Sequence, residues 1–281
     1  MKLLRYGPPG AEKPAMLDRD GTIRCLSSVV RDIDGFALSD AALKMIAALD
    51  PNTLPKVDAG VRLGSCVARP VNYICIGLNY ADHAAEAGMP VPKEPIIFLK
   101  SLGALCGPND DVKMPRGSKK LDWEVELGIV IGKKASYVPE HDSLNYVAGY
   151  CVCNDVSERE YQLERAGTWD KGKGCDTFGP TGPWVVTKDE VPDPQNLALS
   201  TEVNGKRFQN GTTKTMIFGV VKLVSYVSHF ITLYPGDVIA TGTPPGVGQG
   251  VKPEPVFLRP GDTMKLSVAG LGVQTQRVVE A

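Results

Sequence analysis

The 281-residue chain lacks several features that would each indicate a class of protein. It has no run of about 18 apolar residues, which argues against a transmembrane helix, and Pro8 and Pro9 come too early for the apolar region of a signal peptide to form. Its net charge is −1, and it has neither a basic tract nor an acidic tail, so nucleic acid is not an expected partner. We therefore expect a cytoplasmic protein that binds a small molecule.

Common metal, nucleotide and nucleophile motifs are also absent. None of the seven cysteines forms a Cys-x-x-Cys pair, which argues against structural zinc, and their odd number argues against a disulfide framework. The sequence has no phosphate loop, no Gly-x-Gly-x-x-Gly after an expected strand and no nucleophilic serine elbow. It therefore disfavours nucleotide binding and serine-based hydrolysis, and we expect most thiols to be small buried apolar groups.

Glycine and proline are abundant, with 30 and 22 residues, which favours a turn-rich protein with many strands. The pattern predicts an α+β fold built on a β-rich mixed sheet, with a small N-terminal domain at residues 1–70, a linker at 66–70 and a larger domain at residues 71–281. Expected strands cover residues 73–77, 95–100, 123–131, 147–152, 238–241 and 264–268. Expected helices cover 41–49 after Ser39, 82–87 before Gly88, 215–230, and a stretch from a Ser157–Glu160 capping box toward Ala166.

Two glutamates stand out in the expected strand at 123–131. Side chains alternate along a strand, so Glu124 and Glu126 point to the same side, with their Cα atoms roughly 6–7 Å apart. A hard divalent cation between them would remove their repulsion. Asp155 follows the next apolar strand and could supply a third oxygen ligand. The alternative is a solvated strand face, since exposed glutamate is common.

Only three histidines are present, and one of them has a carboxylate at helical spacing. His83 and Glu86 are three residues apart, so they share a helix face, and the carboxylate could orient the ring as a general base toward water. The alternative is a surface histidine with an incidental salt bridge. We expect His141 to be a plain surface residue and His229 to be structural.

Further polar residues could bind an anion. Lys173 lies in a glycine-rich turn and could hold a carboxylate or enolate oxygen. Arg159 and Gln162 share a helix face just after Asp155 and could pair with a substrate carboxylate. An exposed lysine and an exposed polar helix face are the alternatives.

Taken together and in order, these stretches resemble the fumarylacetoacetate hydrolase family. The matching segments are Ile76–His83, Phe98–Lys100, Asp122–Gly128, Asn154–Ser157, Lys173–Pro180 and Thr241–Gly246. The resemblance implies a β-rich mixed-sheet roll with a small N-terminal domain, usually in a homodimer. It implies a Mg²⁺ or Mn²⁺ ion held by Glu124, Glu126 and Asp155.

The same resemblance assigns roles to the other candidates. His83 and Glu86 match a water-activating pair, and Lys173 matches a lysine beside the metal. Thr243 matches a contact to the substrate carboxylate. Arg159, Gln162 and Tyr80 are the remaining expected substrate contacts.

Residues 171–184 resemble, more narrowly, bacterial hydrolases of 2,4-diketo-3-deoxy sugar acids of the L-rhamnonate and L-fuconate type, whose relatives often carry a ureidoglycolate lyase label. This resemblance implies a hydrolase that cleaves a C3–C4 bond to release pyruvate and a hydroxy acid such as lactate. Oxaloacetate decarboxylation, a 2-oxo acid hydratase or isomerase, and a non-catalytic metal-stabilised binding protein remain the alternatives.

Overall fold

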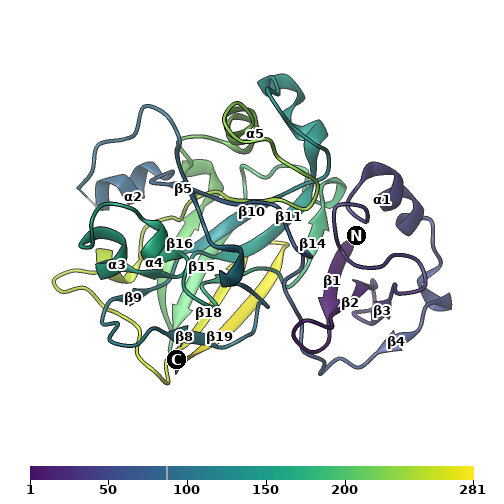
Figure 1. The fold of residues 1–281 in the computed structure, drawn as a ribbon, viewed down its shortest axis with the longest axis horizontal. Helices are drawn as coiled ribbons and strands as arrows, with labels where there is room; N and C mark the ends of the chain where they lie inside the picture. The colour runs from purple at the N-terminus through teal and green to yellow at the C-terminus, as the bar shows by residue number, and fades with distance from the viewer. Residues whose placement is uncertain (87) are drawn as a thin grey trace.

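The structure is a computed structural model that describes residues 1–86 and 88–281. Within these residues a ten-stranded mixed sheet forms the centre, in the order β4-β3-β2-β1-β14-β11-β10-β17-β5-β6 (Figure 1). Its strands are β1 (Lys2–Tyr6), β2 (Lys13–Leu17), β3 (Ile23–Cys25), β4 (Lys56–Val57), β5 (Tyr73–Gly77), β6 (Ile96–Leu99), β10 (Val125–Ile131), β11 (Val147–Asn154), β14 (Val185–Thr187) and β17 (Val238–Ala240).

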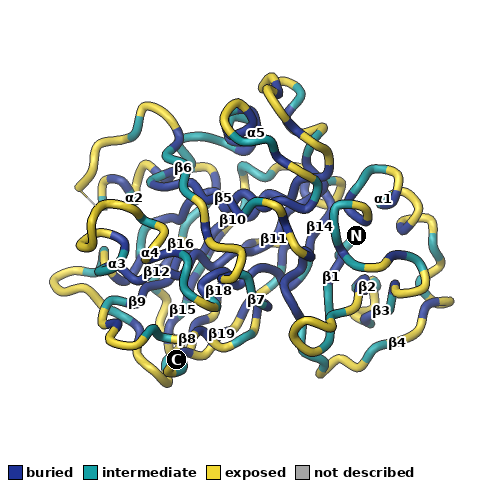
Figure 2. The backbone as a smooth tube through the Cα atoms, viewed as in Figure 1, coloured by how far each residue is buried: buried dark blue, intermediate teal, exposed yellow. Residues whose placement is uncertain are grey.

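A second sheet packs against the middle of the first. Its strand order is β16 (Lys206–Thr212), β15 (Ala198–Val203), β18 (Thr263–Val268), β19 (Gly272–Glu280) and β8 (Val112–Met114). Two short pairs join β12 (Ser157–Glu158) to β9 (Leu121–Asp122) and β13 (Gly179–Pro180) to β7 (Leu105–Cys106). The largest apolar cluster includes Leu127 and Ile129 of β10 together with Leu199 and Leu266 of the second sheet. Figure 2 shows the central strands buried and the connecting loops exposed.

The helices are short and lie around the sheets. They are α1 (Asp40–Ala47), α2 (Ala81–Glu86), α3 (Arg159–Leu163), α4 (Asp170–Lys173) and α5 (Val220–Ser228). Short 3-10 helices cover Pro51–Thr53, Leu102–Ala104, Glu140–Tyr146, Lys188–Glu190, Thr213–Thr215 and Gly248–Gly250. In Figure 1, α2, α3 and α4 lie together on the left. Helices this short depend on tertiary contacts, because an isolated helix of one or two turns is not stable in water.

The expected strands all occur, within a few residues of their predicted ends. The helix after Ser39 is also confirmed, and the Ser39 hydroxyl caps it by accepting the Ala42 N–H. All seven cysteines are free, and four of them are buried. Ala87, at the end of one expected helix, lies outside the described residues, and Gly88 follows with a φ of +66°.

The predicted capping box at Ser157 is wrong. Ser157 and Glu158 pair with β9 instead, and the Ser157 hydroxyl donates to Asp155 O. The carboxylate of Glu158 caps the helix by accepting the Tyr161 N–H at 2.7 Å. The helix ends at Leu163 and does not reach Ala166.

The predicted helix at 215–230 is too long. It begins only at Val220, because the preceding residues are held by Asn79. The Asn79 backbone carbonyl accepts Ile217 N–H at 2.8 Å, and its side-chain oxygen accepts Phe218 N–H at 2.9 Å. These contacts keep the backbone out of the helix, although the apolar spacing of the sequence continues through it.

The first 70 residues share the central sheet. β1 pairs with β14, so β1–β4 extend the sheet on the right of Figure 1. The expected linker has no regular structure, yet Cys66 and Val67 are completely buried. It is therefore a packed connection and not an exposed one, while the domain boundary itself stays a prediction.

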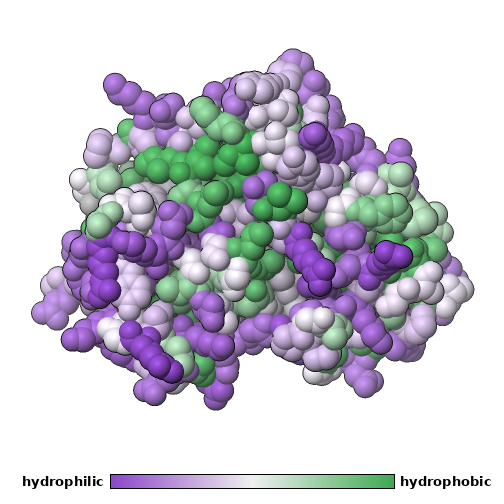
Figure 3. Space-filling model, in the orientation of Figure 1, coloured by the Kyte–Doolittle hydropathy of each residue, from purple (hydrophilic) through white to green (hydrophobic). Residues whose placement is uncertain are grey.

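The opposite end of the sheet is β6, on which Leu99 is 45% exposed. Figure 3 shows apolar surface over this edge. Across residues 1–86 and 88–281, every helix is too short or too polar to cross a lipid bilayer.

Asp237 anchors the residues that follow the packed connection to the start of β17. It is completely buried, and its carboxylate accepts the backbone N–H groups of Val71, Asn72 and Tyr234, each at 2.8 Å. Asn72 Nδ2 adds a fourth bond at 2.7 Å. One buried carboxylate therefore satisfies three separate backbone donors.

Replacing Asp237 with alanine should lower the free energy of unfolding by about 3 kcal/mol, because buried donors lose a charged acceptor. Urea denaturation followed by circular dichroism measures this change. Asp58→Ala, at an exposed turn aspartate, is the control. Equal stability of the two variants would contradict the anchoring role.

Candidate active site

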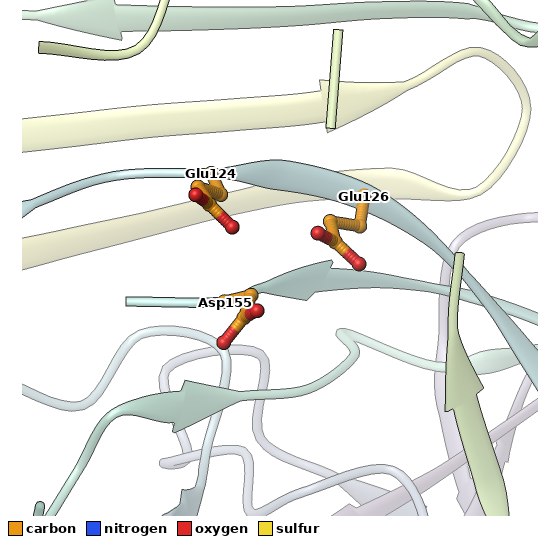
Figure 4. A group of neighbouring side chains, drawn as sticks. All are labelled: Glu124, Glu126 and Asp155. Carbon is orange, nitrogen blue, oxygen red and sulfur yellow. The ribbon is translucent and has the colours of Figure 1, made fainter. Parts of the chain in front are cut away.

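Three carboxylates converge where β10 and β11 pair. Glu124 directly precedes β10, Glu126 lies on it, and Asp155 directly follows β11. The antiparallel register places Val125 opposite Asn154, and Asp155 N–H donates to Glu124 O at 2.9 Å. One oxygen from each carboxylate lies within 4.8 Å of the others; Figure 4 shows the group. The side chains are buried, so the alternative of a solvated strand face is wrong.

Two of the carboxylates have buried cationic partners. Lys173 Nζ lies 2.8 Å from Glu124 Oε2 and 2.7 Å from Asp155 Oδ2. Arg159 lies 2.7 Å from Glu124, and Lys100 lies 2.6 Å from Asp155 Oδ1. Burial alone would raise the pKa of Glu124, but Lys173 and Arg159 outweigh it and lower that pKa to about 2. Glu124 is therefore ionised.

Glu126 is different, because no lysine or arginine among the described residues lies within ion-pair distance of it. Its hydrogen bond comes from the Gly242 N–H at 2.9 Å. Burial, followed by the charges of Asp155 and Glu124, raises the pKa of Glu126 well above its usual range. Asp155 Oδ1 also receives no aligned hydrogen bond from the described residues.

These properties fit a divalent cation. Three buried oxygen donors form a hard ligand set of the kind Mg²⁺ or Mn²⁺ prefers. A cation among them would supply the positive charge that Glu126 lacks, and an uncompensated buried charge is otherwise costly. The residues present therefore suit a divalent metal ion.

His83 and Glu86 form a contact at the edge of the same region. His83 Nδ1 lies 3.0 Å from Glu86 Oε2, and the two side chains are 13% and 19% exposed. A carboxylate only accepts hydrogen bonds, so Nδ1 carries the proton and Nε2 is left as the acceptor. This pair is half-buried, whereas His141 is 80% exposed, as expected of a surface residue. His229 is exposed and follows the end of α5, where its Nδ1 contacts Ser225 O at 2.8 Å, so its expected structural role stays a prediction.

One cavity of about 270 Å³ connects these groups. Its polar wall contains His83, Glu86, Glu124, Glu126, Arg159, Gln162, Lys173 and Thr243, and its apolar wall contains Ile76, Met89, Phe98, Leu163, Trp169 and Val247. Asp155 lies behind Lys173 and is not part of the lining. Trp169 packs edge-on against Phe98, with ring centroids 5.2 Å apart. The cavity is therefore lined by both charged and apolar side chains.

The predicted substrate residues differ in which of their polar atoms remain free to bind a substrate. Arg159 donates to Gln162 Oε1 at 3.0 Å, and the Gln162 amide nitrogen makes no hydrogen bond to the described residues. Thr243 donates to Val125 O at 2.9 Å and accepts from Gln209 at 2.7 Å. The exposed-lysine and exposed-helix alternatives are wrong, since Lys173, Arg159 and Gln162 are buried.

Tyr80 is the one predicted substrate contact that does not line the cavity. It is completely buried, and its hydroxyl has no hydrogen-bond partner among the described residues. A substrate in the cavity would not reach it without movement of the protein.

Two buried residues of the site were not predicted. Lys100 Nζ pairs with Asp155 and donates to the backbone carbonyl of Lys173 at 2.5 Å. Asp122 binds Arg159 Nε at 2.8 Å. Both are charged residues at the end of a short strand, which is the signal that identified Asp155.

Comparison with known proteins agrees with this geometry. The C-terminal model of the fumarylacetoacetate hydrolase family matches residues 72–279. A protein of Burkholderia cenocepacia that carries only a provisional hydrolase name is 62% identical over 281 residues, covering 100% of both chains.

Solved structures of similar fold include hydrolases. The fumarylacetoacetate hydrolase of Exiguobacterium antarcticum is 34% identical with a TM-score of 0.86, and both chains are covered in full (100%). A maleylpyruvate hydrolase of Sphingobium, solved with manganese(II) and pyruvate, is 28% identical with a TM-score of 0.83, again covering 100% of each chain. A 2-hydroxyhepta-2,4-diene-1,7-dioate isomerase of Mycobacterium marinum is 33% identical with a TM-score of 0.75, covering 100% of this chain and 98% of its own. The matched domain, the shared fold and the buried carboxylate cluster lead to one conclusion: the chain belongs to the fumarylacetoacetate hydrolase family.

Proposed function

We propose that this protein is a divalent-metal-dependent hydrolase that cleaves the C3–C4 bond of a 2,4-diketo acid to pyruvate and a second acid. The main support is that a single cavity holds both the His83–Glu86 pair and the carboxylates of Glu124 and Glu126. The similarity to a maleylpyruvate hydrolase solved with manganese(II) and pyruvate is consistent with this chemistry.

The charged wall would hold the 2-oxo acid end of the substrate. Glu124, Glu126 and Asp155 would hold Mg²⁺ or Mn²⁺, which acts as a Lewis acid toward negative charge on the keto oxygen. The free amide nitrogen of Gln162 would donate to the substrate carboxylate. The Lys173 ammonium group is buried beside Glu124 and would stabilise charge that develops on the substrate.

His83 would act as the general base. Glu86 holds Nδ1, so Nε2 would take a proton from water while the water oxygen bonds to the C4 carbonyl carbon. When the C3–C4 bond breaks, its electron pair goes to the pyruvate part as an enolate, which then takes a proton at C3. The C4 part leaves as a carboxylic acid.

The tail of the substrate would face the apolar wall. A 2,4-diketo-3-deoxy acid derived from L-rhamnonate or L-fuconate ends in a methyl group, which Phe98, Leu163 and Trp169 would accommodate. Lactate would then be the second product. This assignment is also supported by the resemblance of residues 171–184 to hydrolases of such acids.

The activity is tested by measuring pyruvate with coupled lactate dehydrogenase over acylpyruvates, 2,4-diketo-3-deoxy sugar acids and oxaloacetate. We expect release from 2,4-diketo acids, loss of release with a chelator, and recovery on addition of Mg²⁺ or Mn²⁺. Release from oxaloacetate alone would instead indicate a decarboxylase, and tight metal binding without release from any substrate would indicate a binding protein.

Replacing His83 with alanine should lower kcat for a 2,4-diketo acid by at least about 100-fold, because the general base is lost. Binding of Mn²⁺, measured by calorimetry, should be unchanged. His141→Ala is the matched control at an exposed histidine. Near-normal turnover of His83→Ala would rule out the assigned base, and oxaloacetate decarboxylation, which needs no attacking water, should persist in that variant.

Replacing Glu126 with glutamine should weaken Mn²⁺ binding at least about 100-fold, because a ligand oxygen is lost. The metal-free protein should become no less stable, because burial raises the pKa of Glu126 and makes this carboxyl group less favourable in the folded protein at neutral pH than a neutral amide.

Glu158→Gln is the matched control for this variant, since Glu158 is buried but accepts three hydrogen bonds. It should lower the free energy of unfolding by about 1–3 kcal/mol and leave metal binding intact. If Glu126→Gln bound Mn²⁺ as tightly as the control, Glu126 would not be a ligand.

A further inference from the structure

The loop at residues 246–250, with the sequence Gly-Val-Gly-Gln-Gly, runs along the cavity between two carboxylates. Val247, Gln249 and Gly250 contribute to the cavity wall. At its start, the Gly246 N–H donates to both oxygens of Glu86, at 2.9 and 3.2 Å. The same Glu86 carboxylate holds His83. The start of the loop is therefore tied to the proposed base.

The middle of the loop is tied to Asp122. Gly248 N–H donates to Asp122 Oδ1 at 2.6 Å, and Gln249 N–H donates to Oδ2 at 3.0 Å. Asp122 Oδ2 also accepts from Arg159 Nε at 2.8 Å. Asp122 also accepts the Trp123 N–H at 2.8 Å and is completely buried, so water cannot replace it easily. A charged acceptor that binds four donors strongly restricts their positions.

The three glycines explain how the backbone approaches both carboxylates. A Cβ atom at Gly246 would lie 2.0 Å from Phe208 O, and Gly246 has a φ of +100°. A Cβ atom at Gly248 would lie 2.8 Å from Asp122 Oδ1, and one at Gly250 would lie 2.5 Å from the Glu86 carboxyl carbon. Side chains at these positions would push the backbone off the carboxylates or displace the carboxylates themselves.

We propose that residues 246–250 form a clamp loop that sets the position of the His83–Glu86 pair relative to Arg159, and that Asp122 is a positioning residue. Arg159 contacts Glu124 and Gln162. By holding Arg159, Asp122 therefore determines the position of these two residues, which form the substrate-binding side of the cavity. The loop joins that side to the base, which lies on a separate element, α2. The kinetic consequences of this proposal rest on the proposed function.

The two attachments should have separable effects. Gly250→Ala brings a methyl group against Glu86, so it should lower kcat at least about tenfold through His83 and change KM less than about twofold. Asp122→Asn removes the charge that orients Arg159, so it should raise KM about tenfold or more and lower kcat less. Neither substitution removes a group that is proposed to contact the substrate.

The controls match each substitution in chemistry. Gly60→Ala adds a methyl group where no atom lies within 4 Å of the new Cβ. Asp237→Asn neutralises another completely buried aspartate, which accepts backbone N–H groups and does not line the cavity. It should lower the free energy of unfolding, but it should not change kcat and KM by different factors.

Amide hydrogen exchange provides a measurement that does not depend on activity. In the full-length protein, exchange of residues 244–252 should be slow, and it should accelerate at least about tenfold in Asp122→Asn but not in Asp237→Asn. In Gly250→Ala, the Gly246 amide should exchange faster. If the wild type hydrolyses no diketo acid, the proposed function fails, and the exchange result still decides whether the loop is clamped.

The proposal is overturned if exchange of residues 244–252 in Asp122→Asn equals that in Asp237→Asn. It is also overturned if, in an active enzyme, Gly250→Ala has the kcat of Gly60→Ala, or if Asp122→Asn shifts kcat and KM no more than Asp237→Asn does.

Discussion

The pairing of β10 with β11 brings three carboxylates into a buried space, and the surrounding site depends on this constraint. Like charges in a low-dielectric interior repel strongly, so the fold must supply positive charge nearby. Lys173, Lys100 and Arg159 supply it to Glu124 and Asp155. Glu126 is left without a cation among the described residues. A metal ion bound here would supply the missing positive charge.

The compensating charges come from elements far apart in the sequence. Lys100 follows β6, whereas Arg159 and Lys173 lie on the short helices α3 and α4. These helices are too short to be stable alone. The Glu158 carboxylate caps α3, and the ion pairs of Arg159 and Lys173 hold both helices to the site. The charge balance of the site and the local structure around it therefore stabilise each other. The related hydrolases and isomerase share the fold, so differences in reaction must come from side chains around the cavity.

Local patterns were sufficient for the six expected strands, but they missed other strands, such as β1, β15 and β19, and they did not give every helix correctly. Short apolar runs bounded by turns, such as Tyr73–Gly77, became strands as expected, because side-chain alternation and turn residues act over only a few positions. The helix at Val220 was predicted too long, because Asn79, far away in the sequence, binds the residues before it. Ser157 was assigned the wrong role for the same reason: pairing with β9 took its backbone out of the helix.

The sequence by itself identified the residues that we propose to carry the chemistry. Glu124 and Glu126 share a side of a strand because of its two-residue period, and His83 and Glu86 share a face of a helix because of its spacing. Only the tertiary structure decided that Lys173 stands between Glu124 and Asp155, that Tyr80 lies outside the cavity, and that Asp122 joins Arg159 to the glycine-rich loop. Those relations depend on contacts between distant segments, and no local spacing rule encodes such contacts.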